Sequence, residues 1–190
     1  MNLETTTMKT KFAWVTIFLL LVSVTTLTIL PSCEKVKEAA KFKVKYDLPD
    51  SRFTVDPLTL LKSEHLLYSQ PYTVNIDSIL GANKGLVSKI NVYKIRLSVV
   101  SPDDVTLGWI DSGRITITPA GGVPIDIATT PAITSTMRTF DFIVKDTDVS
   151  SAMNGTFQLD VYGSVKPPIP TSSFELLLQS GLEITISPLK

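Results

Sequence analysis

Residues 174–186 read Phe-Glu-Leu-Leu-Leu-Gln-Ser-Gly-Leu-Glu-Ile-Thr-Ile, with apolar side chains at nearly every second position. A period of two places alternate side chains on opposite faces of a β-strand. Residues 155–165 show the same pattern, since Phe157, Leu159 and Val161 share one parity. We therefore predict two long strands, each with one buried face, and we expect them to pair as an antiparallel hairpin. The Pro-rich connection 166–173 (KPPIPTSS) reverses the chain between them.

Alternation extends outward from this pair through most of the chain. The sequence holds 23 Thr, 17 Val and 16 Ile against 8 Ala, a composition typical of strands. Residues 114–118 and 123–127 flank Pro-Ala-Gly-Gly and predict a second hairpin. A change of parity near Tyr93 predicts a bulge, and Gly163 and Gly181 are predicted sites of a bulge or of close approach. Further strands are expected at residues 41–48, 72–76 and 137–144, whereas residues 58–68 are ambiguous between helix and strand.

Two short helices are expected between strands. Asp77-Ser78 would cap one that runs through Val87, and Asp146 would cap another over residues 147–153. Eight to ten short strands with hairpin spacing predict an all-β fold, an antiparallel β-sandwich of immunoglobulin-like or related topology. The cysteine pair of true immunoglobulin domains is absent, because the chain has a single Cys.

The N-terminal region is a different kind of segment. Lys9 and Lys11 precede an uncharged apolar run at residues 12–30, which ends in Leu30-Pro31-Ser32-Cys33. A run of this length fits either a cleaved secretory signal or a membrane anchor. The ending resembles the lipobox of bacterial lipoproteins, as an apolar residue lies three positions before the cysteine and a small residue lies immediately before it. Pro31 departs from the small residues usual in that box, and the alternative is an uncleaved anchor with a chance cysteine.

The resemblance covers residues 8–33 and implies lipidation of Cys33 and cleavage between Ser32 and Cys33. The predicted organisation is a signal peptide at 1–32, a lipidated tether at 33–40 and a β-sandwich domain at 41–190. An N-terminal lipid would hold the protein on a membrane without spanning it. Glu34 replaces the Asp that would resemble an inner-membrane retention signal, which favours the outer membrane, at its periplasmic or cell-surface face.

The sequence offers little material for catalysis or for cofactors. His65 is the only imidazole, and no G-x-S-x-G motif surrounds a serine. Asp103-Asp104 and Asp146-Thr147-Asp148 are close acidic pairs, but the segment from Asp146 lacks the Gly and Glu that a Ca²⁺-binding loop needs. A Ca²⁺ site built from separate turns stays open. We expect no catalytic residues, no cofactor and no metal site among the motifs.

The charge balance excludes a nucleic-acid-binding stripe. Eighteen basic and eighteen acidic residues cancel, and removal of residues 1–32 leaves a formal charge of minus one. Trp109 is the only tryptophan after the signal segment, and Tyr93 and Tyr162 lie on predicted strands. An exposed Trp109 would suit stacking on a sugar, although a Trp within an apolar strand is usually core.

These patterns predict a non-catalytic, lipid-anchored envelope or cell-surface β-sandwich that acts as a structural, adhesive or protein-interaction module. Its partners would be the membrane, through the lipid, and another envelope protein or complex. The alternative is a glycan-binding lipoprotein that serves polysaccharide capture and uses Trp109. The two differ in whether Trp109 and a tyrosine lie exposed on one face.

Overall fold

The computed structural model describes residues 35, 38, 40–57, 65–153 and 155–188. The chain divides into two compact units, and the fold below is that of the unit Lys41–Pro188. The predicted signal cleavage at Ser32 and lipidation at Cys33 lie outside the described residues. Among those that are described, no helix is both long enough and apolar enough to cross a membrane.

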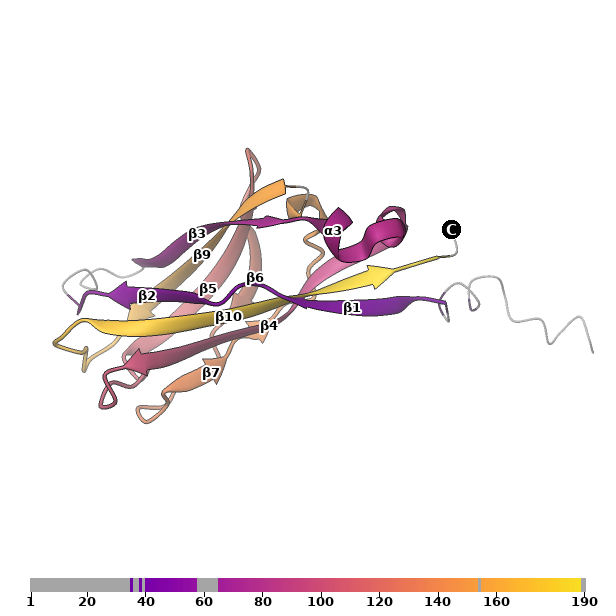
Figure 1. Cartoon of the computed structure of the whole chain (residues 1–190). Helices are drawn as coiled ribbons and strands as arrows, with labels where there is room; N and C mark the ends of the chain where they lie inside the picture. The colour runs from indigo at the N-terminus through magenta and orange to yellow at the C-terminus, as the bar shows by residue number, and fades with distance from the viewer. Residues whose placement is uncertain (1–34, 36–37, 39, 58–64, 154, 189–190) are drawn as a thin grey trace, which may run out of the picture. The chain divides into compact units, whose positions relative to one another are not determined.

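One sheet, here called sheet A, is organised around its longest partners, β10 (Phe174–Ile186) and β4 (Val87–Ser101). They pair antiparallel, and β7 (Thr139–Asp141) pairs with the other edge of β4. The free edge of β10 is covered by β1 (Phe42–Asp47) and β2 (Ser51–Val55), which lie end to end along it (Figure 1). Pro49 separates β1 from β2, which fits its missing N–H donor.

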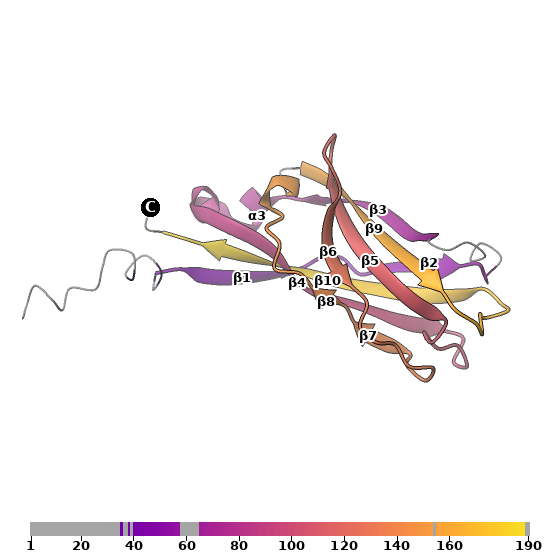
Figure 2. The same cartoon turned by 180° about the vertical axis from the view of Figure 1, so that it is seen from behind.

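The second sheet, sheet B, has the order β3-β9-β5-β6-β8. Its strands are β3 (His65–Val74), β9 (Gly155–Val165), β5 (Ile110–Pro119), β6 (Ile125–Thr129) and β8 (Ile143–Val144). All pairings are antiparallel. Figure 2 shows this sheet in front of sheet A. The predicted hairpin of residues 114–118 with 123–127 is confirmed as β5 and β6, with Ile117 opposite Ile125.

The pairings are nested along the chain. The first strands pair with β10, β3 pairs with β9, β4 pairs with β7, and β5 pairs with β6. A long hairpin folded back on itself and then rolled into two sheets produces this order, which is the jelly-roll arrangement. The predicted all-β antiparallel sandwich is therefore confirmed, and the jelly roll is the related topology that it adopts.

The prediction that residues 155–165 and 174–187 pair as a hairpin is wrong. Strand β9 lies between β3 and β5, and β10 lies between β4 and the β1–β2 pair, so both edges of each strand are already used. The connection 166–173 crosses from one sheet to the other. The predicted parity still holds, because Leu159 of β9 and Ile184 of β10 are both buried in the core between the sheets.

Two bulges fit against two glycines. Gly181 pairs with Lys94 and Leu182 pairs with Val92, so Tyr93 is the extra residue, as the parity change predicts. A similar shift in β3 leaves Leu67 unpaired, and a Cβ atom on Gly163 would lie 2.8 Å from Cδ1 of Leu67. The predicted close approach at both glycines is confirmed.

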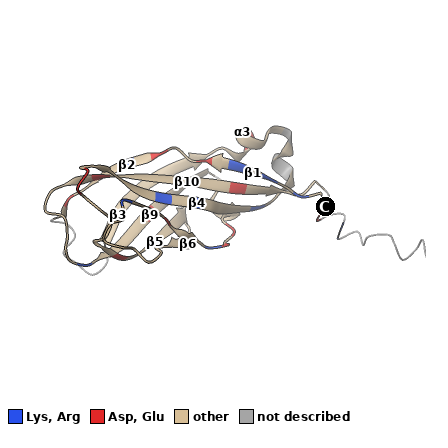
Figure 3. Cartoon of the chain, turned by 90° about the horizontal axis from the view of Figure 1, so that it is seen from below, with Lys and Arg blue, Asp and Glu red and all other residues tan. Residues whose placement is uncertain are grey.

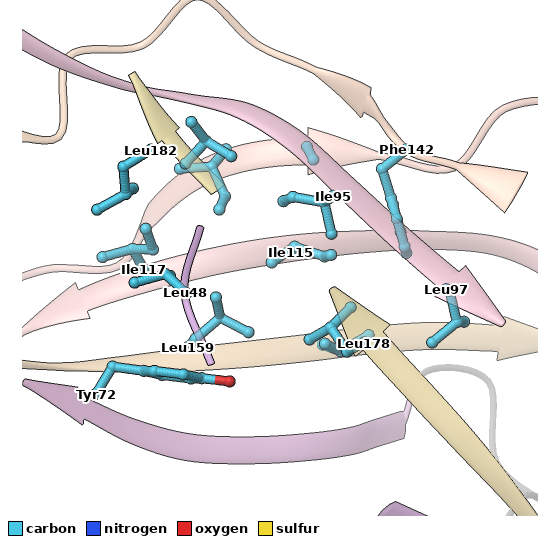
Figure 4. Packing of buried hydrophobic residues seen from close by; sticks show 14 of the residues in the cluster. Leu48, Tyr72, Ile95, Leu97, Ile115, Ile117, Phe142, Leu159, Leu178 and Leu182 are labelled. Atoms are coloured by element: carbon cyan, nitrogen blue, oxygen red, sulfur yellow. The ribbon is translucent and has the colours of Figure 1, made fainter. Parts of the chain in front are cut away.

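The core lies between the sheets and takes side chains from both of them (Figure 4). Ile95, Leu178 and Leu182 extend from sheet A toward Ile117 and Leu159 of sheet B, and all five are almost fully buried. Burial of apolar area of this extent is the dominant stabilising term for a domain of this size.

The two predicted helices form in shortened versions with different caps. Helix α3 (Ile76–Leu80) begins after Asn75, whose side chain accepts a hydrogen bond from the Ser78 N–H, so Asn75 is the cap rather than Asp77. A 3₁₀ segment, Gly81–Leu86, continues it to β4. The second segment is a single 3₁₀ turn, Ser150–Ala152, and Asp146 does not cap it.

Candidate functional site

A hollow at one end of the sandwich is the candidate site, and we call it the tip pocket. Strand ends position it: β4 ends and β10 begins beside each other, with Ser101 opposite Glu175, while Ile110 at the start of β5 lies opposite Val165 at the end of β9. The two connections 102–109 and 166–173 therefore meet there. The pocket has a volume of about 300 Å³ and is lined by Pro102, Asp104, Val105, Thr106, Trp109, Pro168, Ile169, Pro170, Thr171 and Ser172.

The wall made by residues 102–109 is held firmly. The Leu107 N–H donates to the Met137 carbonyl (2.6 Å), and Arg138 forms an ion pair with Asp103 (3.2 Å). Gly108 passes so close to a neighbouring loop that a Cβ atom there would lie 2.6 Å from Cα of Ser135. Only a residue without a side chain fits at position 108, and this fixes the backbone that leads into Trp109.

Trp109 is the inner residue of the pocket. Its carbonyl accepts a hydrogen bond from the Lys166 N–H (2.8 Å), which ties the two connections together. The indole packs on Phe174 with ring centroids 5.3 Å apart, and the residue is 2% exposed. The Nε1 donor is buried and has no hydrogen-bond partner within the described residues, although buried Trp N–H groups usually have one.

Trp109 is therefore buried, as expected for a Trp within an apolar strand, and it does not form the exposed platform that the glycan-binding alternative uses. The indole lies between the sheets because residue 109 immediately precedes β5 and faces Phe174. Tyr93 lies at the bulge of sheet A and Tyr162 lies on β9 beneath Arg114, whose guanidinium carbon is 4.3 Å from the ring centroid. These three aromatic residues do not share an exposed face.

The polar side chains that line the tip pocket are those of Asp104, Thr106, Thr171 and Ser172. Asp104, Thr171 and Ser172 are exposed and Thr106 is half-buried. Within the described part of the chain, none of the four makes a side-chain hydrogen bond or ion pair. Asp104 is the only charged residue among the residues that line the pocket. Sequence reasoning singled out Asp103-Asp104 only as an acidic pair, and the structure shows that Asp103 pairs with Arg138 whereas Asp104 lines the pocket.

The other acidic residues singled out from the sequence are engaged elsewhere. Asp146 accepts a hydrogen bond from Lys89 (2.8 Å), which lowers the pKa of Asp146, and it also accepts one from Asn91. Asp148 accepts hydrogen bonds from the backbone N–H groups of Ile90 (3.2 Å) and Ser150 (2.9 Å). Over residues 40–57, 65–153 and 155–188, no three His, Cys, Asp or Glu side chains come together to hold a metal ion.

Polar side chains of β3 and β9 in sheet B form a hydrogen-bonded network. The carboxylate of Asp160 is buried and accepts a hydrogen bond from Ser69 (2.5 Å), which in turn accepts one from Gln158. His65 lies at the start of β3, opposite Gly163. Basic and acidic side chains are interspersed over the strands (Figure 3). Among the described residues, four ion pairs join neighbouring strands, namely Lys43–Glu183, Arg52–Glu175, Arg96–Asp141 and Arg114–Asp126.

Comparisons with known proteins give no family. No family model matches the chain, and no curated protein matches it. Solved structures with a similar fold include infectious bursal disease virus of the Gx strain (14% identity, TM-score 0.38, 77% of this chain and 32% of that chain). The Gt strain of the same virus (11%, 0.39, 76% and 33%) and desmodium yellow mottle tymovirus (15%, 0.26, 79% and 90%) are also similar. The chain spans about one third of the bursal disease virus chains.

Proposed function

We propose that the protein is a non-catalytic lipoprotein of the outer membrane, held by a lipid on Cys33, whose sandwich presents the tip pocket to a binding partner. It would act as an adhesive or interaction module at the periplasmic or cell-surface face. The proposal rests on one relationship. The strand that follows the predicted tether and the loops of the tip pocket lie at opposite ends of β10.

This relationship comes from the register of the sheet. Phe42, the first residue of β1, pairs with Ile186, whereas Phe174 at the start of β10 adjoins the tip loops. Twelve residues separate Phe174 from Ile186, which corresponds to roughly 40 Å along a strand. Eight residues link Cys33 to Lys41, a span of at most about 30 Å. Anchoring through Cys33 would thus hold the β1 end near the membrane and leave the tip pocket farther from it.

The arrangement of polar groups supports a binding role rather than a catalytic one. A hydrolase would need a nucleophile beside a base or two facing carboxylates. The tip pocket offers one carboxylate, Asp104, together with hydroxyl groups and no imidazole. Such a set is suited to holding a ligand.

Two linked measurements test the proposal. Metabolic labelling with a fatty acid should mark the native chain but not Cys33→Ser, and the variant should leave the membrane fraction or remain an unprocessed precursor. Next, a photo-crosslinking residue is placed in living cells at Thr171, in the tip, or at Ser88, an exposed position near the β1 end. Crosslinks to an envelope component are expected at Thr171 and not at Ser88. Unchanged labelling of Cys33→Ser, or crosslinks confined to Ser88, would overturn the proposal.

A further inference from the structure

The geometry points to a neutral saccharide, one or two sugar rings in size, as the ligand of the tip pocket. This inference rests on the proposed function, because it names the partner class for the same site. Its basis is the size of the pocket, the charge of its lining and the combination of apolar and polar residues in that lining.

The size limits the ligand. About 300 Å³ is at the lower end of the range of small-molecule pockets, so a single small molecule or the end of a longer chain would fill it. A protein partner that relied on this contact alone would need about 800 Å² of surface on each side, far more than such a hollow supplies. A terminal sugar unit suits the space.

The charge of the lining residues further limits the class of ligand. No Lys or Arg is among the residues that line the pocket, whereas phosphate, sulfate and carboxylate groups are generally held by cations or by clustered N–H donors. The one charged lining residue, Asp104, would repel an anion. A neutral ligand rich in hydroxyl groups would instead donate hydrogen bonds to its carboxylate, and hydrogen bonds to an ionised group are the stronger kind.

The lining combines the apolar and polar residues that a sugar ring requires. Pro168, Ile169 and Pro170 offer apolar contacts for the C–H face of a ring, while Thr106, Thr171 and Ser172 bring hydroxyl groups that both donate and accept. These hydroxyl groups have no partner within the described residues, so a ligand would not have to displace protein contacts. Trp109 lines the same pocket, so its indole emission would report a change there.

The test uses the full chain in detergent, carrying Trp14→Phe so that Trp109 is its only tryptophan. Maltose, cellobiose, lactose and diacetylchitobiose are titrated, with sialyllactose as the charged counterpart of lactose. Calorimetric heat and a change in Trp109 emission are the readouts. At least one neutral disaccharide should bind, and sialyllactose should bind more weakly than lactose if lactose is that ligand.

Matched variants localise the binding. Asp104→Ala should weaken affinity at least about tenfold, since it removes a charged acceptor. Asp146→Ala removes an exposed carboxylate that pairs with Lys89, near the opposite end of β4 from the pocket, and should stay within about twofold. Ser172→Tyr should block binding by filling an exposed rim position.

Three results would overturn the inference: no heat from any neutral sugar at millimolar concentration, equal losses in Asp146→Ala and Asp104→Ala, or a preference for the charged sugar. If acylation and tip crosslinks persist while no sugar binds, the ligand class is wrong and the proposed function stands. If a sugar binds with the expected variant pattern but Cys33→Ser is still acylated, the anchoring proposal fails alone.

Discussion

The ring of Tyr93 lies against the backbone of Gly181, on the neighbouring strand of sheet A. A Cβ atom on Gly181 would lie 2.9 Å from Cζ of Tyr93 and 2.8 Å from Oδ1 of Asp47. The Tyr93 hydroxyl donates a hydrogen bond to that same carboxylate (2.5 Å), so the ring cannot move aside without losing it. The bulge at Tyr93 and the glycine at 181 therefore depend on each other.

Gly181→Ala should lower the free energy of unfolding by about 1 to 3 kcal/mol, because the added methyl group overpacks a tight contact. Urea unfolding measures the change. The control is the pair of variants Tyr93→Ser and Tyr93→Ser/Gly181→Ala. In the Tyr93→Ser background, which lacks the ring, Gly181→Ala should lower the free energy of unfolding clearly less. An equal effect in both backgrounds would show that the ring is not the cause.

Truncation of buried side chains on β9 and β10 should lower stability far more than changes to the outward-facing side chains between them. Leu159→Ala and Ile184→Ala remove buried side chains and should each lower stability by roughly 2 to 5 kcal/mol. Glu183→Gln loses only a surface ion pair with Lys43 and should change stability by about 1 kcal/mol or less. Denaturant midpoints compare the variants, and similar losses on both faces would contradict the observed strand orientation.

Tyr72 should make the fold sensitive to alkali. Burial raises the pKa of Tyr72 to about 12 from an ordinary value of 10.0, and its hydroxyl is hydrogen-bonded with Ser51. A raised folded-state pKa means that this contribution to stability is present below pH 10 and is lost as the pH rises toward 12. Because the hydrogen bond to Asp47 also raises the pKa of Tyr93, absorbance titration should show one fewer late-ionising tyrosine in Tyr72→Phe than in the native protein. Ionisation of every tyrosine near pH 10 in the folded protein would refute this.

Chelation should leave the melting temperature of the full chain unchanged. Asp103 faces Arg138 and Asp146 faces Lys89, so these carboxylates already have cationic partners within the described structure. A drop in melting temperature with a chelator, restored by added Ca²⁺, would instead show a Ca²⁺ site built from separate turns.

Much of the strand pattern could be predicted from the sequence. Alternation identified the buried faces of residues 155–165 and 174–186, and the change of parity located the bulge at Tyr93. These features are local, since the side chains of a strand alternate whichever strand lies beside it. The turn between β5 and β6 was equally readable, because Gly121 has the positive φ (69°) that its sequence context suggests.

Strand partners and the candidate site were decided only by the tertiary structure. Alternation shows which face of a strand is buried but not which strand pairs with its edge, and so the chain crosses between sheets at residues 166–173 where a hairpin was expected. Trp109 packs on Phe174, which lies 65 residues further along the chain. Asp104, Thr171 and Ser172 line one pocket only because β4 and β9 end, and β5 and β10 begin, at the same end of the sandwich. Local propensity carries no information on such contacts, since they depend on how the two sheets pack.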